Sequence, residues 1–162
     1  MSATLQALAL QLEQSSVGAA VRTSTWMYPS AEIGHVLGLG VLLGTAVAFD
    51  LRLLGVARHL PVAALADFLL PCARAGFSLA AATGALLFAA NATTLLNAVF
   101  AAKLAAIALA VVNASLFHRA TYRDVATWNT DATAPPPARI AAVISLLCWT
   151  TAVACGRLLA YI

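Results

Sequence analysis

Charge is what this sequence lacks most. Only 9% of its residues are Asp, Glu, Lys or Arg, whereas 62% are hydrophobic; a soluble domain carries about 25% charged residues. No acidic or basic residue occurs in four long stretches, which are 33–49, 75–102, 104–117 and 140–156. So little polar surface cannot cover a globule in water, so the chain must be dissolved in lipid.

Several functional signatures are also absent. The nine basic residues are scattered and form no basic face, which excludes nucleic acid as a partner. The three cysteines form no CxxC pair, and we interpret them as small buried hydrophobic residues. There is no Ser-His-Asp set, phosphate-binding loop or zinc-binding pattern, and the longest connection, 119–137, is too short to hold a soluble catalytic centre.

Residues 1–25 predict a separate interfacial segment. Leucines recur there at helical spacing opposite polar residues, with Leu5, Leu8 and Leu12 facing away from Gln6, Glu13 and Gln14. This pattern predicts a short amphipathic helix lying on the membrane surface. No Lys or Arg occurs in the first 21 residues, so attraction to anionic lipid does not drive its binding.

Residues 26–162 predict an all-α, integral membrane four-helix bundle. The spanning helices are expected at 30–54, 71–90, 95–117 and 138–161. The apolar piece PVAALADFLL after the first of these is expected to form a separate helix at the interface. Six arginines lie in or beside the first and third connections and two lie on the opposite side, so we place those connections in the cytoplasm and both termini in the periplasm of a bacterial inner membrane.

Ionisable side chains occur at one level of the predicted bundle. At about 1.5 Å per residue from the expected helix ends, His35 lies roughly 7 Å, Lys103 roughly 12 Å and Arg157 roughly 5 Å below the outer surface. Glu32 stands one turn above His35. Charged groups inside a bilayer are rare and usually functional, so we expect these side chains to share a polar pocket. Gly38, one turn along the face of His35, is expected to leave room beside the imidazole.

Other ionisable residues are expected at the inner side. Asp50 lies two residues before Arg52, and Arg74 is near the expected start of the second helix. A buried carboxylate needs a partner, so these three residues are predicted to form a polar cluster. We interpret His59 and His118, which lie beside arginines at inner helix ends, as interfacial residues near lipid phosphates.

Parts of the chain resemble known membrane proteins. The chain resembles an uncharacterised family of small bacterial inner-membrane proteins. The segments that carry the resemblance are WMYPSAEIGHVLGLGVLLGTAVAFDLRLLG, FAAKLAAIALAVVNASLFH and GRLLAY. It extends over nearly the whole chain from Trp26 onward. More distantly, the chain resembles the haem-containing bacterial protoporphyrinogen oxidases and the membrane domains of copper-resistance D proteins. The matching positions are His35, Arg52-Leu53, Lys103 and His118. This resemblance implies a haem b site that uses His35, with Lys103 nearby.

The chemistry of these side chains suits a haem site. A neutral imidazole is a good ligand for haem iron, so His35 is the predicted metal ligand. Arg157 and Lys103 would meet the propionates, Glu32 would orient His35 or pair with Arg157, and Gly38 would border the slot for the porphyrin. The iron would be five-coordinate, or would take Lys103 or a partner's residue as its second axial ligand.

Three functional hypotheses remain at this point. The first is a haem b protein that transfers electrons, with quinone or a redox partner subunit exchanging them. The second is a non-catalytic structural or assembly subunit of a larger membrane complex, or a homo-oligomer. The third is a small transporter, which is weaker because neither inverted repeats nor broken helices are evident.

Overall fold

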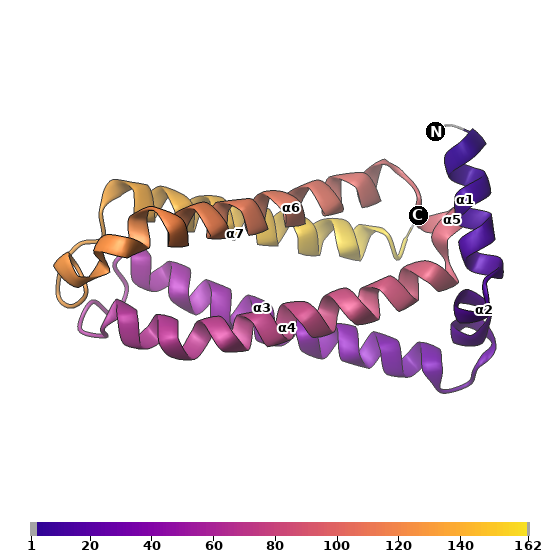
Figure 1. Ribbon diagram of the computed structural model, residues 1–162, viewed down its shortest axis with the longest axis horizontal. Helices are drawn as coiled ribbons and strands as arrows, with labels where there is room; N and C mark the ends of the chain where they lie inside the picture. The colour runs from indigo at the N-terminus through magenta and orange to yellow at the C-terminus, as the bar shows by residue number, and fades with distance from the viewer. Residues whose placement is uncertain (1–2, 162) are drawn as a thin grey trace.

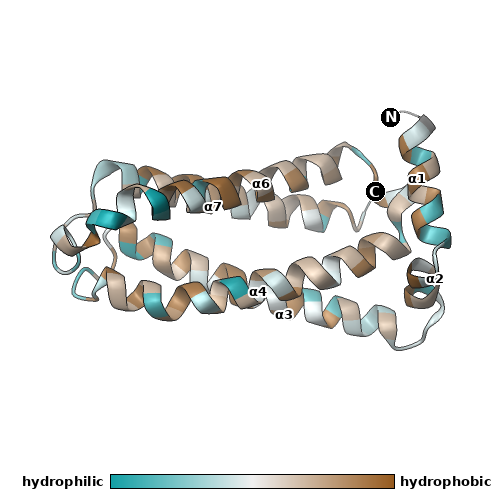
Figure 2. Ribbon diagram, viewed as in Figure 1, coloured by the Kyte–Doolittle hydropathy of each residue, from teal (hydrophilic) through white to brown (hydrophobic). Residues whose placement is uncertain are grey.

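The computed structural model describes residues 3–161, which contain helices and no strand. The fold has four long helices, each antiparallel to the one before it (Figure 1): α3 (Met27–Leu53), α4 (Val62–Ala90), α6 (Ala98–Arg119) and α7 (Pro136–Leu158). Each is long and apolar enough to cross a membrane. Hydrophobic residues predominate along all four helices, and the connection between α6 and α7 is more hydrophilic (Figure 2). The protein is therefore a helical membrane bundle, which confirms the fold class predicted from composition.

The two ends of the bundle differ (Figure 1). At one end, here called the terminal end, α3 and α6 begin and α4 and α7 finish. At the other, here called the loop end, the connection after α6 forms the 3-10 helix η1 (Thr121–Thr127). The predicted interfacial segment comprises two helices, α1 (Ala3–Gln14) and α2 (Ser16–Thr23), which run across the terminal end. Ser15 separates them because its side chain accepts a hydrogen bond from the amide of Gly18 and so caps α2.

The segment α1 is tethered to the short helix α5 (Ala92–Leu95), which connects α4 to α6. The carboxylate of Glu13 accepts hydrogen bonds from the backbone N–H of Thr93 at 2.8 Å and from its hydroxyl at 2.7 Å. These two bonds lower the pKa of Glu13, because they stabilise its charged form. A polar contact thus holds the interfacial segment against the end of the bundle.

The prediction that the second spanning helix begins at Pro71 is wrong. The piece expected to lie separately at the interface forms the start of α4, and Pro71 lies inside that helix. The helix can begin at Val62 because Asn129 caps its first turn. The backbone carbonyl of Asn129 accepts a hydrogen bond from Val62 N at 2.9 Å, and the side-chain oxygen of Asn129 accepts one from Ala63 N at 2.8 Å. Membrane helices tolerate an internal proline when neighbouring groups satisfy the freed backbone.

This earlier start also moves Arg74. It lies twelve residues into α4, about 18 Å from the loop end, and its side chain is exposed. The predicted cluster of Asp50, Arg52 and Arg74 is therefore wrong. The guanidinium of Arg52 is 2% exposed and donates instead to three backbone carbonyls, those of Leu60 at 2.7 Å, Arg58 at 2.9 Å and Asn129 at 3.0 Å.

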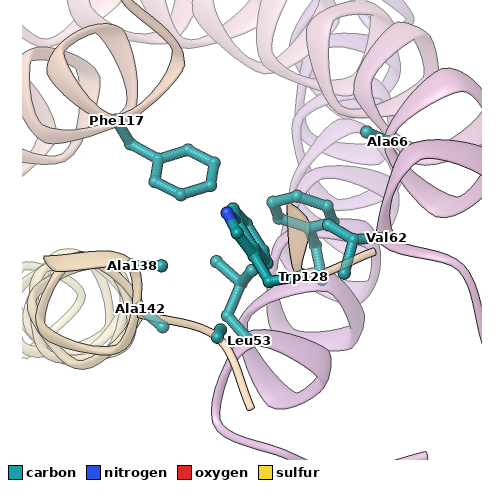
Figure 3. Close-up of a cluster of buried hydrophobic side chains, with 9 residues drawn as sticks. Leu53, Val62, Ala66, Phe117, Trp128, Ala138 and Ala142 are labelled. Carbon is teal, nitrogen blue, oxygen red and sulfur yellow. The ribbon is translucent and has the colours of Figure 1, made fainter. Parts of the chain in front are cut away.

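The main hydrophobic core lies at the loop end, where all four long helices meet. The connection after α6 folds back there, and the indole of Trp128 inserts among Leu53, Val62, Phe117 and Ala138 (Figure 3). Towards the terminal end, the buried apolar side chains of the long helices are mostly small, for example Ala80, Ala110 and Ala152. Most contacts between the long helices are within the pair α3 and α4 or within the pair α6 and α7. The bundle thus consists of two helical hairpins joined mainly at the loop end.

We predict that Arg52 is essential for stability. Replacing Arg52 with Gln removes charge-assisted hydrogen bonds to both connections and should lower the free energy of unfolding by about 2–4 kcal/mol. Thermal unfolding followed by circular dichroism in detergent measures the change. The matched control is Arg119→Gln, which removes the same charge from an exposed side chain and should leave the midpoint nearly unchanged. Equal midpoints for the two variants would contradict the role given to Arg52.

A second prediction concerns the contact between α3 and α4. A Cβ on Gly38 would lie 2.7 Å from the backbone nitrogen of Ala80 and 2.9 Å from the carbonyl oxygen of Gly76, so Gly38→Ala should destabilise the hairpin by about 1–3 kcal/mol. Gly40 has nothing within 4 Å of its Cβ position, so Gly40→Ala should be neutral or stabilising, by up to about 1 kcal/mol. The same unfolding experiment compares them, and a Gly38→Ala variant as stable as Gly40→Ala would contradict the packing.

Candidate functional site

His35 lies on α3 near the terminal end, half-buried against α4. Its Nδ1 is 2.8 Å from the carbonyl oxygen of Ala80 and 3.4 Å from the hydroxyl of Thr83. A carbonyl oxygen can only accept, so the geometry requires the proton on Nδ1. In the neutral imidazole, Nε2 then carries the free lone pair, and among the described residues it has no hydrogen-bond partner.

A glycine on the neighbouring helix makes room for this ring, but it is not the one expected. A Cβ on Gly84 of α4 would lie 3.0 Å from Cε1 of His35, so any larger residue there would displace the imidazole. Gly38 instead faces the backbone of α4. The backbone atoms of Gly76 and Ala80 fill the space next to Gly38 that was expected to be open beside the imidazole. The expected role of Gly38 beside a ligand is therefore wrong, because its face is used for helix packing.

Lys103 occupies a similar place in the other hairpin. It lies on α6, half-buried, and its Nζ is 3.4 Å from the Cβ position of Gly156 on α7. Of the predicted site residues, His35 and Lys103 both lie half-buried near the terminal end, on opposite hairpins.

Glu32 and Arg157 are not brought together. Both side chains are exposed, and within the described part of the chain Glu32 makes no hydrogen bond or ion pair. Arg157 donates to the hydroxyl of Tyr161 at 2.7 Å, and its guanidinium lies 4.9 Å from the centre of that ring. Tyr161 is four residues on, one helical turn away, so it engages Arg157 locally before a residue of another helix can.

The observed helix ends also change the depths inferred above. The helix α3 begins at Met27 and α6 at Ala98, so His35 lies about 12 Å and Lys103 about 8 Å along its helix. Both remain within the spanning segments, with Lys103 the shallower of the two. A cation above the imidazole is a suitable position for an anionic group of a bound molecule.

The ligand set limits what this site can hold. The described residues contain no group of three or more His, Cys, Asp or Glu side chains placed to hold a metal ion. A free transition-metal ion normally takes three or four protein ligands, whereas haem iron, already held by four porphyrin nitrogens, needs one imidazole. His35, with a defined tautomer and an unshared Nε2, therefore fits haem better than a bare ion.

A second group of polar residues, which the sequence did not bring together, lines a cavity at the loop end. Asp50, Asn113, His118 and Ser145 reach it from three helices. Their places in the sequence gave no signal that they would meet, since Asp50 is two residues before Arg52 and His118 is next to Arg119. His118 had been interpreted as interfacial, but its Nε2 is buried without a hydrogen-bond partner. His59, in contrast, is exposed.

Comparison with known proteins identifies a family and no function. No curated protein and no solved structure matches the chain significantly. A family model matches residues 11–162, nearly the whole length, and describes a family of unknown function. This agrees with the resemblance to an uncharacterised family noted above, and no named relative supports the more distant resemblance to haem proteins. The chain belongs to DUF6644, a family of unknown function.

Proposed function

We propose that this protein binds haem b through Nε2 of His35 and transfers single electrons within the membrane. The observation that carries the proposal is the hydrogen bond from Nδ1 of His35 to the carbonyl oxygen of Ala80, 2.8 Å long. In metalloproteins, a histidine ligand commonly donates its other N–H to a backbone carbonyl, which sets the tautomer and orients the ring. His35 has this arrangement in an apolar environment.

The surroundings of His35 support the same proposal. Lys103 provides a cation at a shallower level, where it would meet a propionate. Phe88 and Phe100, stacked with ring centres 4.9 Å apart, are the aromatic contact between α4 and α6 at this end. Haem would lie between the two hairpins, where the buried apolar side chains are mostly small. Bound haem would supply one-electron chemistry, and the protein would hold it, exclude water and set its potential.

The electron partners follow from the location. Four spanning helices place His35 within the bilayer, so the donor or acceptor is a lipid-soluble quinone or a redox subunit in the same membrane. The second axial position would be left open, filled by Lys103, or filled by a partner's residue. The distant resemblance to protoporphyrinogen oxidases and copper-resistance D proteins is consistent with this proposal, although Arg52 of the shared Arg-Leu pair has a structural role here.

The test is the visible spectrum of the protein purified from haem-replete cells. The wild type should show a Soret band and, when reduced, an α-band. His35→Ala should lose both and stay folded, because one hydrogen bond contributes only about 1 kcal/mol. The control is His59→Ala, which removes an exposed histidine and should keep the spectrum. A colourless wild type would contradict the proposal and favour the structural-subunit hypothesis.

The proposed orientation places the loop end in the cytoplasm of a bacterial inner membrane and both termini in the periplasm. With Arg74 now inside α4, five arginines remain at the loop end (Arg52, Arg58, Arg119, Arg123 and Arg139) against Arg22 and Arg157 at the terminal end. Positive residues are enriched on the cytoplasmic side. In this orientation His35 lies in the outer half of the membrane.

Labelling of single cysteines checks the orientation. In a chain whose three cysteines are replaced by Ala, Thr94→Cys at the terminal end and Thr130→Cys at the loop end are both exposed. A membrane-impermeant maleimide added to intact cells with a permeabilised outer membrane should label the first variant and leave the second unlabelled. Disruption of the cells should make both reactive, and the reverse pattern in intact cells would overturn the orientation.

A further inference from the structure

A cavity into which four polar residues project lies inside the bundle at the loop end, well separated along the helices from His35. Its volume is about 120 Å³, and residues of all four long helices line it. Most of the lining is apolar, including Phe49 and Leu70. The polar side chains are Asp50 of α3, Asn113 and His118 of α6, and Ser145 of α7. The haem proposal uses none of them.

Within residues 3–161, Asp50 has no cation as a partner. Its side chain is 6% exposed, and its Oδ2 is buried without a hydrogen bond. Ser145 is the polar residue next to the carboxyl group, while the nearby Arg52 directs its guanidinium to backbone carbonyls. Burying an ionised carboxylate without a cation costs far more than burying the neutral acid. The environment therefore favours a carboxyl group that carries its proton.

His118 supplies an acceptor to the same cavity. Its Nδ1 is 2.8 Å from the carbonyl oxygen of Ala114, so Nδ1 carries the proton of the neutral ring. Its Nε2 is buried and has no partner among the described residues. The ring is held between Phe49, stacked at 6.5 Å, and Tyr122, at 5.4 Å. The Nε2 lone pair therefore requires a hydrogen-bond donor.

Asn113 adds a second acceptor. Its amide nitrogen donates to the carbonyl oxygen of Ala141 at 2.9 Å, which leaves the side-chain oxygen to accept. The cavity thus combines two acceptors with one acid and one hydroxyl, and no lining residue is a cation. One water needs roughly 10–15 Å³ of such space and two to four polar partners. A volume of about 120 Å³ with these partners is large enough for several waters.

We propose that Asp50 and His118 form a water-bridged proton-binding pair inside the membrane. Asp50 releases its proton from Oδ2 to a bridging water, which passes one of its own protons to Nε2 of His118. The neutral acid and neutral imidazole become carboxylate and imidazolium, so the total charge of the pair does not change. His118 is in the last turn of α6.

Both members of the pair lie near the loop end. Asp50 faces the bundle interior, and His118 lies one residue before the end of α6, beside η1 at the loop end. Tyr122 is a further titratable group that contacts His118. Burial and the nearby Asp67 raise the pKa of Tyr122, so its hydroxyl keeps its proton at neutral pH. The lining residues of α4 and α7 do not ionise. The pair therefore holds its shared proton within the bundle, close to the loop end.

Infrared spectroscopy of the protein in lipid nanodiscs tests this proposal. The wild type should show the C=O band of a protonated carboxyl group at neutral pH, and the band should shift when aspartate is labelled with carbon-13. Asp50→Asn should lose the band. The matched control, Asp67→Asn, removes an exposed aspartate of α4 and should retain it. The isotope shift assigns the band to aspartate even if Asp50→Asn does not fold.

Coupling to His118 is tested separately. His118→Gln preserves a hydrogen-bonding side chain but cannot hold the transferred proton, so the carboxyl band should shift in frequency and titrate at a different pH from the wild type. No protonated carboxyl band at neutral pH, or a band that His118→Gln leaves unchanged in both respects, would overturn the pair. A band removed by sodium at constant pH would show a metal-cation site instead. None of these outcomes depends on haem.

Discussion

The buried guanidinium of Arg52 holds the loop end together. It joins the connection between α3 and α4, through the carbonyls of Arg58 and Leu60, to the connection between α6 and α7, through the carbonyl of Asn129. Asn129 in turn caps the start of α4. Since water is scarce beside the hydrocarbon, backbone groups need partners within the protein. One side chain supplies three such bonds, and the core around the neighbouring Trp128 forms on this framework.

Both half-buried histidines of the bundle follow one pattern. His35 and His118 each place Nδ1 2.8 Å from a backbone carbonyl, of Ala80 and Ala114 respectively. The carbonyl selects the tautomer and leaves Nε2 as an acceptor that has no hydrogen-bond partner in the described part of the chain. The first carbonyl belongs to a neighbouring helix and the second to the preceding turn of the same helix. Each bond stabilises the ring position, and the remaining lone pair provides the chemistry proposed for each site.

Glycines on partner helices accommodate the polar side chains at the terminal end. Gly84 lies beneath the ring of His35, and Gly156 beneath the ammonium group of Lys103. Other glycines serve packing alone, since Gly38 and Gly76 bring the backbones of α3 and α4 into contact. Small residues are common at helix contacts in membranes because close approach replaces the missing hydrophobic driving force. Their two uses look alike in sequence, where only the spacing within one helix is visible.

The sequence by itself determined the solvent, the number of spanning helices and the end at which His35 and Lys103 lie, because these follow from the length and order of apolar runs. It did not determine where α4 begins, because the side chain that caps Val62 and Ala63 comes from Asn129, far along the chain. Nor did it assign partners to Asp50, Gly38 or Arg157. The partners of these side chains depend on the rotation and register of neighbouring helices. Backbone contact between α3 and α4 and the hydrogen bonds of Arg52 set both, and such contacts exist only once the helices have packed.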